Sequence, residues 1–332
     1  MIELTVCPSN LQPGYQTYSP SARRLLFDSA HVSHILSEPK PSDDSAEANE
    51  ILRQTGRISI SGAQPKFSLL TEKGRLRYAL GDEQGTFIMK PAPVGYQIIN
   101  KEYCAANEHL TMQLASQVYG IITAPNALCF FQCDDSIAYI TRRFDVSPQG
   151  KLRQEDFAAL MGYSKDLNGS DYKYSMGSYE ECGEIIRRHV KAYLPDLRRL
   201  FRLVLFNFIT LNDDAHLKNF SLLEQENEFR LAPAYDLINT SLQIWEPRIF
   251  ALENGLFREG MHLSDTRSVR AADFKELGRR FGLPDKIIEK DLQLMTGQHP
   301  LAKKLIDNSF LSEELKLRYF DGYDFRRRML TF

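Results

Sequence analysis

The sequence predicts an α+β protein with two lobes, of which the first is rich in strands and the second is all-helical. Between residues 57 and 145, short runs rich in Ile, Phe, Tyr and Leu are separated by Gly, Pro and Asp turn residues, a pattern typical of strands. After about residue 150, apolar residues recur in longer segments with the period of helices. A cleft between two such lobes is a favoured place for a ligand.

The first 56 residues are expected to form an N-terminal extension and a polar linker. Residues 37–50, SEPKPSDDSAEANE, contain two prolines and no large apolar residue, which indicates a surface loop or mobile linker. Large apolar side chains before this linker are expected to pack on the first lobe; they are Tyr15, Tyr18, Leu25, Leu26 and Phe27.

Residues 57–145 make up the predicted first lobe. Its strand-like runs are, in order, RISISG, KFSLLTEKGRLRYAL, GTFIMKP, ALCFFQ and SIAYITRRF. One helix is expected among them, NKEYCAANEHLTMQLASQVYG, and it ends at Gly120 because glycine readily adopts the left-handed conformation that terminates many helices.

Residues 146–332 make up the predicted second lobe. The segment SYEECGEIIRRHV opens with Ser178 and Glu181, which have the spacing of a capping box. Further helices are expected in PDLRRLFRLVLFNFITL, AADFKELGRRFGL and KIIEKDLQLM, and the segment SLLEQENEFRLAP looks like a hairpin.

The composition excludes several classes of protein. The 332 residues are 43% apolar, enough for a substantial core, and a formal net charge of −2 gives no broad basic face for nucleic acid. Five scattered cysteines indicate a reducing compartment, and Cys129 and Cys133 lack a second pair for zinc. We expect no signal peptide, and the most apolar segment, residues 200–211, is shorter than the roughly 18 residues of a membrane span. A cytoplasmic protein without membrane or direct nucleic-acid contact is therefore expected.

A polar cluster follows that most apolar segment. The stretch FNFITLNDDAHLKNFSLL, residues 206–223, contains Asp214 and, after four intervening residues, Asn219, while Asp236 follows in APAYDL. In protein kinases the first Asp of D-x-x-x-x-N accepts the hydroxyl proton, and the Asn and a downstream Asp hold Mg²⁺. The alternative is that these are turn residues that cap the next element. Asp213 is a rival catalytic base, or else it caps the turn.

The upstream sequence supplies the other parts of a phosphate site in the kinase order. Residues 57–67, RISISGAQPKF, are small and loop-like, Lys90 ends the apolar strand TFIMK, and Glu108 follows in the expected helix. A buried Lys90 would need a carboxylate partner, and Glu108 is a candidate. Taken singly, Lys90 is as well explained as a solvated strand residue and Glu108 as a solvent-facing helix charge. The order and spacing of all the parts favour kinase-type phosphoryl transfer.

The sequence departs from the ordinary protein-kinase pattern in two ways. It has neither a G-x-G-x-x-G loop nor an H-R-D motif, and His216 stands two residues after Asp214, where many protein kinases have lysine. A G-x-x-x-x-G-K-[ST] motif is also absent, which excludes a P-loop NTPase as a motif assignment.

Seven motifs occur in a fixed order between about residues 57 and 240: SISGAQPKFSLL, FIMKP, NEHLTMQLA, TRRFD, QEDFAALMG, NDDAHLKNFSL and PAYDL. Together they resemble the HipA-type serine/threonine kinase toxins of bacterial toxin–antitoxin systems. About 55 residues precede the serine-rich loop, where HipA has a further small subdomain, and Arg142 stands where HipA has Glu. Both features are similar to the shorter HipT branch, in which a separate small protein, HipS, acts beside a helix-turn-helix protein, HipB.

The resemblance implies a two-lobed, protein-kinase-like fold and a role for each matched residue. Asp214 would be the catalytic base, and Asn219 and Asp236 would hold Mg²⁺. Ser59 and Ser61 would be autophosphorylated, which adds about two negative charges each beside the ATP phosphates. ATP would contact the phosphate-covering loop and the walls of the cleft through Ser61, Gly62, Ala63, Gln64, Pro65, Lys66, Lys90, Glu108, Arg142, Arg143, Phe144, His216, Lys218 and Tyr235.

The function that the resemblance implies is that of an ATP- and Mg²⁺-dependent serine/threonine protein kinase toxin. Its expected target is an aminoacyl-tRNA synthetase, whose phosphorylation arrests translation and growth, and its expected partners are HipS-like and HipB-like proteins. Two alternatives stay open. Small-molecule phosphotransferases share the D-x-x-x-x-N pattern, and a pseudokinase would bind a partner without catalysis.

Overall fold

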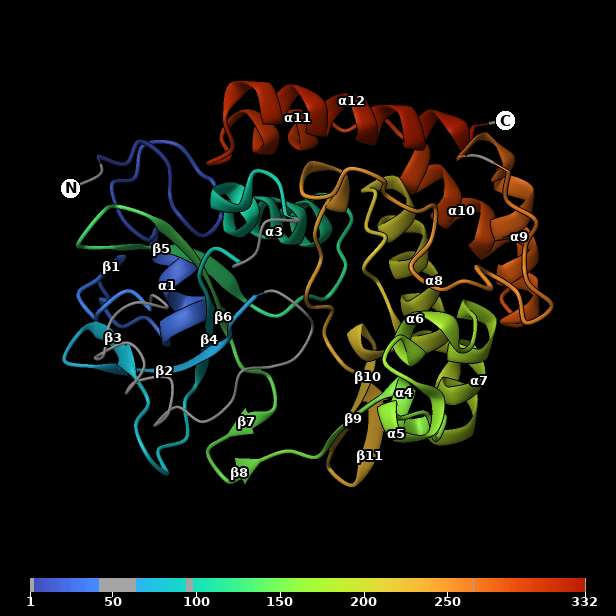
Figure 1. Ribbon diagram of the computed structural model, residues 1–332, viewed down its shortest axis with the longest axis horizontal. Coiled ribbons are helices and arrows are strands. Elements are labelled where there is room, and N and C mark those ends of the chain that lie inside the picture. Colours follow the sequence, from blue (N-terminus) through green and yellow to red (C-terminus); the bar gives the residue numbers. More distant parts are fainter. Residues whose placement is uncertain (1–2, 42–63, 94–97, 265, 332) are drawn as a thin grey trace.

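A six-stranded sheet lies on one side of the molecule and most of the helices lie on the other, in a mixed α+β architecture (Figure 1). The computed structural model describes residues 3–41, 64–93, 98–264 and 266–331. The sheet has the order β1-β5-β6-β4-β2-β3, and its neighbours are antiparallel except for the parallel pair β1 and β5. Its strands are β1 (Ile35–Leu36), β2 (Phe67–Glu72), β3 (Arg75–Tyr78), β4 (Phe87–Lys90), β5 (Asn126–Phe131) and β6 (Ile137–Arg142).

The helix expected between these strands packs against β5 and β6. It begins as a 3₁₀ turn, η1 (Lys101–Tyr103), continues as α3 (Cys104–Gln113) and ends in a π turn, η2 (Leu114–Val118). Gly120 then has a φ of +57°, the left-handed conformation expected of the residue that ends this helix. All 10 residues of α3 are buried, so any charged side chain on it requires a partner.

The N-terminal extension packs against the six-stranded sheet through α1 (Pro20–Phe27) and β1. Three of the five apolar residues expected to make this contact are buried with the sheet residues: Tyr18, Leu26 and Phe27. Tyr15 is half-buried against them. The expectation for Leu25 is wrong, because this side chain is 64% exposed on the outer face of α1. The expected strand RISISG and most of the linker, residues 42–63, lie outside the described part of the chain.

The part of the chain after residue 145 is not all-helical, which corrects the expectation for the second lobe. It contains a three-stranded antiparallel sheet of order β11-β10-β9. Glu226 and Asn227 have φ values of 52° and 62°, so a two-residue turn closes the hairpin that the sequence indicated. The strands are β7 (Val146–Ser147) and β8 (Gly150–Lys151), which pair with each other, and β9 (Gln154–Asp156), β10 (Ser221–Gln225) and β11 (Glu228–Leu231).

Helix α8 forms the centre of the helical part and is buried along most of its length. Ser178 caps α7 as expected, since its hydroxyl accepts a hydrogen bond from the Glu181 N–H. No helix in the described ranges is both long and apolar enough to cross a membrane. The helices are α4 (Phe157–Leu160), α5 (Lys165–Asn168), α6 (Tyr172–Ser175), α7 (Tyr179–His189), α8 (Tyr193–Ile209), α9 (Ala271–Arg280), α10 (Asp285–Thr296), α11 (Pro300–Asp307) and α12 (Glu313–Met329), with short 3₁₀ turns η3 (Leu217–Asn219), η4 (Thr240–Leu242) and η5 (Thr266–Ser268).

Candidate active site

Side chains from three distant segments meet at the end of strand β4. Lys90 is the last residue of this strand, Glu108 lies in the middle of α3, and Asp236 follows β11. The Lys90 Nζ lies 2.6 Å from Glu108 Oε1 and 2.5 Å from Asp236 Oδ1. One ammonium is thus held between two carboxylates, one from helix α3, which packs on the six-stranded sheet, and one from the segment after β11.

Burial and charge oppose each other at this triad. The side chains of Lys90 and Glu108 are only 4% and 3% exposed. Burial alone would lower the pKa of Lys90, but Asp236 and Glu108 outweigh it and raise that pKa above its ordinary value. Burial raises the pKa of Glu108, although Lys90 opposes this effect. Lys90 therefore stays protonated and cationic, whereas the negative charge on Glu108 is the one that burial destabilises.

Asp236 is the most strongly stabilised carboxylate of the group. A second ammonium, Lys66 Nζ, lies 3.1 Å from its Oδ2 atom. Burial acts to raise the pKa of Asp236, but Lys66 and Lys90 overcome it and hold this pKa well below its usual range. Asp236 also has a φ of +56°, a left-handed conformation that is uncommon outside glycine and concentrates at functional sites.

The two adjacent carboxylates after α8 have different surroundings. Asp213 is 8% exposed, and its Oδ2 accepts a hydrogen bond from the backbone N–H of Arg248 at 2.5 Å. Asp214 is half-buried, and its Oδ1 accepts a hydrogen bond from the Tyr174 hydroxyl at 2.5 Å. Burial raises the pKa of Asp214, partly offset by the Tyr174 hydrogen bond. Asp213 thus anchors the backbone at Arg248, whereas Asp214 is the more exposed of the two carboxylates.

The residues after Asp214 contribute buried polar atoms without partners. Both ring nitrogens of His216 and the Oδ1 atom of Asn219 are buried and have no hydrogen-bond partner among the described residues. Burial lowers the pKa of His216 to about 3, so its ring is neutral. An unpartnered amide oxygen and an ionised carboxylate are hard oxygen donors of the kind that Mg²⁺ prefers. The side chains of Asn219 and Asp236 therefore have the donor chemistry that a Mg²⁺ site would need.

Two cavities adjoin the triad. The larger has a volume of about 490 Å³ and reaches from the triad past Asp214 to the segment around Arg248. The smaller, of about 160 Å³, lies between the triad and the residues that follow β6. Both are lined by Lys66, Lys90 and Asp236, so these three side chains stand at the boundary between the two spaces.

Arg142, Arg143 and Phe144, three of the residues expected to contact ATP, line the smaller cavity. The rings of Phe144 and Tyr235 lie 5.7 Å apart, and Ile88 and Ala124 add apolar walls. The side chain of Arg142 forms an ion pair with Asp28 beyond α1, and that of Arg143 pairs with Asp145. Both arginine side chains are therefore paired with protein carboxylates, and their backbone N–H groups donate to the Pro125 and Thr86 carbonyl oxygens.

The structure places the remaining expected residues less centrally or does not describe them. Gln64 lines the larger cavity and donates a hydrogen bond from Nε2 to the Pro91 carbonyl oxygen at 3.0 Å. Lys218 is exposed and lies 3.5 Å from Asp156. Pro65 lies between Gln64 and Lys66 and lines neither cavity. The expected residues Ser59, Ser61, Gly62 and Ala63 lie outside the described part of the chain.

Tyr174 and Lys173 were missed by sequence reasoning. Both line the larger cavity and lie on α6, a helix of only 4 residues. A helix of this length is too short to show an apolar period. A tyrosine that donates a hydrogen bond to a carboxylate in another segment also has no signature in the sequence around it. The contact depends on tertiary structure alone.

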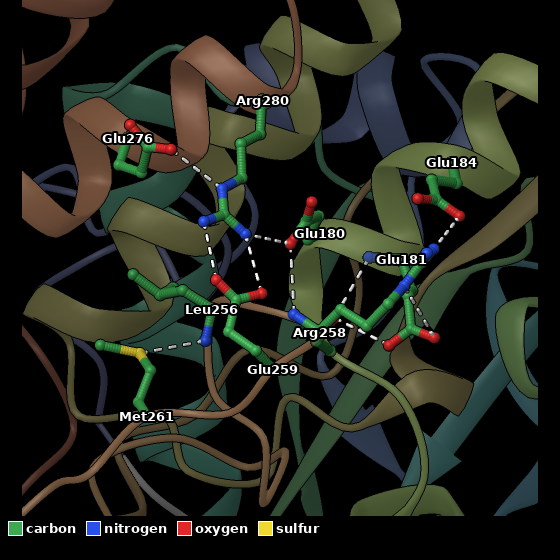
Figure 2. A network of polar contacts seen from close by, with 10 residues as sticks. Glu180, Glu181, Glu184, Leu256, Arg258, Glu259, Met261, Glu276 and Arg280 are labelled. Atoms are coloured by element: carbon green, nitrogen blue, oxygen red, sulfur yellow. Dashed lines mark hydrogen bonds and ion pairs between the residues drawn. The ribbon is translucent and has the colours of Figure 1, made fainter.

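An ion network links helices α7 and α9 to the segment that contains Arg258 and Glu259 (Figure 2). Arg280 of α9 pairs with Glu180 of α7 and with Glu259, while Arg258 pairs with Glu184 of α7. Arg258 and Glu259 are thereby tied to two helices. In the same connecting segment, the backbone N–H of Glu253, a residue that lines the larger cavity, donates to the Tyr174 carbonyl oxygen at 3.0 Å.

Comparisons with known proteins agree with this architecture. A family model described as the HipA-like C-terminal domain matches residues 58–300. A Haemophilus influenzae protein described as a putative kinase is 28% identical over 313 residues, which cover 89% of this chain and 87% of that protein. The serine/threonine-protein kinase toxin HipA of Shewanella oneidensis is 26% identical over 269 residues, which cover 72% of this chain and 58% of that protein.

A solved structure shares the fold. It is the complex of Shewanella oneidensis HipA with HipB and operator DNA, and the match has a TM-score of 0.65 at 22% identity. It covers 83% of this chain and 65% of that one. The chain thus spans most of the Haemophilus relative and less than two thirds of the two HipA chains.

Proposed function

The chain belongs to the HipA-like C-terminal domain family, and from this membership we propose that it is an ATP- and Mg²⁺-dependent protein kinase. The observation that carries the proposal is the triad of Lys90, Glu108 and Asp236, which joins two cavities within reach of Asp214. The cationic Lys90 lies between an apolar cavity and a cavity lined by the Asp214 carboxylate. This arrangement suits a nucleotide whose phosphates point toward an acceptor. Relatives described as kinases support the same reading.

The smaller cavity would take the purine. Phe144 and Tyr235 offer aromatic faces, and Ile88 and Ala124 offer apolar walls. Lys66 and Lys90, which stand where the two cavities meet, would then face the phosphates. Because Lys66 now pairs with Asp236, phosphate binding would exchange one anionic partner of Lys66 for another.

Asn219 and Asp236 would hold Mg²⁺ beside those phosphates. The metal would neutralise charge that develops on the transferred phosphoryl group. Asp236 brings a carboxylate that stays ionised at any physiological pH, and Asn219 brings an amide oxygen without another partner. Lys90 keeps Asp236 in place through its 2.5 Å contact.

Asp214 would act as the base that takes the proton of the acceptor hydroxyl. Its position in the larger cavity exposes it to an incoming side chain, and its raised pKa makes it a better proton acceptor than an ordinary aspartate. Asp213 is a poorer candidate, because it is more deeply buried than Asp214 and accepts the backbone N–H of Arg248.

We further infer that the molecule works as two lobes, residues 57–145 and 146–332, with residues 1–56 packed on the first. Support comes from the separate locations of the six-stranded sheet and the helices (Figure 1). The site would then lie in the cleft, where hinge motion opens and closes it around nucleotide.

The finer biological role that we propose is that of a serine/threonine kinase toxin of the HipT branch. It would phosphorylate an aminoacyl-tRNA synthetase, be regulated by autophosphorylation at Ser59 and Ser61, and act in the cytoplasm with HipS-like and HipB-like partners. The name of the Shewanella relative and the HipB–DNA complex of its solved structure support a toxin–antitoxin setting.

The test is phosphate transfer from labelled ATP by the wild type and by two matched variants, Asp214→Asn and Asp213→Asn. With a bacterial lysate as acceptor, label should appear in a discrete protein band. We expect Asp214→Asn to lose transfer by at least about a hundredfold while ATP binding changes little, because the base acts on the acceptor. Asp213→Asn should keep more of the activity and lower stability instead.

The other outcomes are equally informative. Label in small molecules only would indicate a small-molecule phosphotransferase. ATP binding without transfer would indicate a pseudokinase, and equal turnover in Asp214→Asn would remove Asp214 from the mechanism. Phosphate on Ser59 or Ser61 that persists in Asp214→Asn would mean that another kinase places it.

A further inference from the structure

We propose that Tyr174 is a positioning residue for Asp214: its hydroxyl holds one carboxylate oxygen so that the other is presented to the acceptor hydroxyl. The inference rests on the proposed role of Asp214 as the base. It adds a residue that no motif in the sequence singles out.

The geometry gives the two carboxylate oxygens of Asp214 different partners. The Tyr174 hydroxyl donates to Oδ1 at 2.5 Å, the length of a charge-assisted hydrogen bond. Within the described residues, no other group donates a hydrogen bond to this carboxylate. Oδ2 is therefore left for an acceptor in the larger cavity, which Asp214 and Tyr174 both line.

Tyr174 is itself held from three sides. Its carbonyl oxygen accepts the Glu253 N–H at 3.0 Å, its ring meets the buried His216 ring edge-on at 4.9 Å, and the Lys173 ammonium lies 4.9 Å from the ring centre. Five and six residues after Glu253, Arg258 and Glu259 take part in the ion network of Figure 2. A hydroxyl supported in this way fixes the carboxylate orientation rather than following it.

The direction of the hydrogen bond distinguishes positioning from proton transfer. Burial and the nearby Asp214 raise the pKa of Tyr174 well above its usual value, so the tyrosine keeps its proton. In the proposed step the acceptor oxygen bonds to phosphorus, the bond from phosphorus to ADP breaks, and the acceptor proton passes to Asp214 Oδ2. The Tyr174 proton stays on Tyr174, and its hydrogen bond stabilises the ionised form of Asp214 that this step requires.

Removal of that hydrogen bond should therefore raise the pKa of Asp214. The groups that face Asp214 are Lys173 and Tyr174 of α6, the adjacent Asp213, Lys66 and Asp236 across the cavity, Cys104 of α3 and Tyr179 of α7. Only the Tyr174 contribution changes when its hydroxyl is deleted. The acidic limb of the rate profile should then move to higher pH, because Asp214 must be ionised to accept a proton.

The experiment compares Tyr174→Phe with Tyr172→Phe, a matched loss of a hydroxyl on the same helix. We expect Tyr174→Phe to lower kcat about tenfold or more and to move the acidic limb up by roughly one pH unit, with KM for ATP unchanged. Tyr172→Phe should match the wild type in all three.

A second measurement does not depend on activity. Selective ¹³C labelling of aspartate carboxyls, with Asp214 assigned from the Asp214→Asn spectrum, follows its titration by NMR in both variants. A raised pKa in Tyr174→Phe alone supports the proposal. An unchanged pKa, or a higher kcat in Tyr174→Phe, overturns it while leaving the proposed kinase intact. A wild type that transfers no phosphate overturns both.

Discussion

The charge on Lys90 should be neutralised adequately by either of its two carboxylates, and this redundancy can be measured. Lys90 Nζ lies 2.6 Å from Glu108 and 2.5 Å from Asp236, and its side chain is 4% exposed. The perturbations are Glu108→Gln and Asp236→Asn, singly and together, which remove charge while keeping the size of each side chain.

Of the two single variants, Glu108→Gln, at the more deeply buried carboxylate, should lower the free energy of unfolding less than Asp236→Asn does. Burial already penalises the charge of Glu108, and Asp236 remains to neutralise Lys90, so Glu108→Gln should cost about 1 kcal/mol or less. Asp236 is stabilised by two ammonium groups and its side chain is 25% exposed, so Asp236→Asn should cost about 2 kcal/mol after allowance for solvent screening.

The double variant should cost more than the sum. It leaves Lys90 as a buried ammonium without a counter-charge, a change that typically costs about 3–5 kcal/mol by itself. We therefore expect a total near 5 kcal/mol and a coupling energy of about 2 kcal/mol between the two sites.

Urea unfolding followed by far-UV circular dichroism measures these values without nucleotide. Tryptophan fluorescence is unsuitable, because the single tryptophan, Trp245, is already 79% exposed in the folded state. Glu102→Gln, an exposed carboxylate on η1, is the control and should stay within about 0.5 kcal/mol of the wild type. Additive single-variant costs, or a cost above about 3 kcal/mol for Glu108→Gln alone, would refute the redundancy.

Two further predictions concern stability. The pKa of Asp236 is lowered on folding, so its contribution to stability is present above the unfolded pKa of about 4 and is lost as pH falls toward the folded value. The unfolding free energies of wild type and Asp236→Asn should accordingly differ by a constant amount above about pH 5 and converge as pH falls below about 4. Gly183 of α7 packs under Phe281, and a Cβ there would lie 2.7 Å from Phe281 Cδ1. Gly183→Ala should lower the free energy of unfolding by about 1–3 kcal/mol, whereas Arg188→Ala on the exposed face of α7 should leave it nearly unchanged.

Local sequence was sufficient for most elements of the fold. The strands β2 to β6 and the helices α3 and α7 to α10 were predicted because each has its own apolar period and its own turn or capping residue. The three-stranded sheet was not predicted, because β9 is only 3 residues long and pairs with β10, which follows some 65 residues later. A pairing of that range has no signature in either segment.

The candidate active site was likewise predicted only in part from the sequence. Lys90, Asp214, Asn219 and Asp236 stand in a recognisable order along the chain, so sequence alone gathered them into one hypothesis. The sequence could not predict that the Tyr174 hydroxyl contacts Asp214, which lies 40 residues later in the chain. Nor could it predict the ion pairs of Arg142 and Arg143. Those features depend on which side chains the folded backbone brings together.

The adjacent carboxylates Asp213 and Asp214 show why local sequence leaves a catalytic assignment open. Both follow α8, both are partly or fully buried, and burial raises the pKa of both. What separates them is the partner of each: a backbone N–H of Arg248 in one case and a tyrosine hydroxyl beside a cavity in the other. A backbone donor holds Asp213 in a structural role, because rotation of that carboxylate would break its hydrogen bond with the Arg248 N–H. Asp214 is the more exposed of the two and is oriented by a tyrosine hydroxyl, and this difference in surroundings, rather than its pKa, is what favours it as the base.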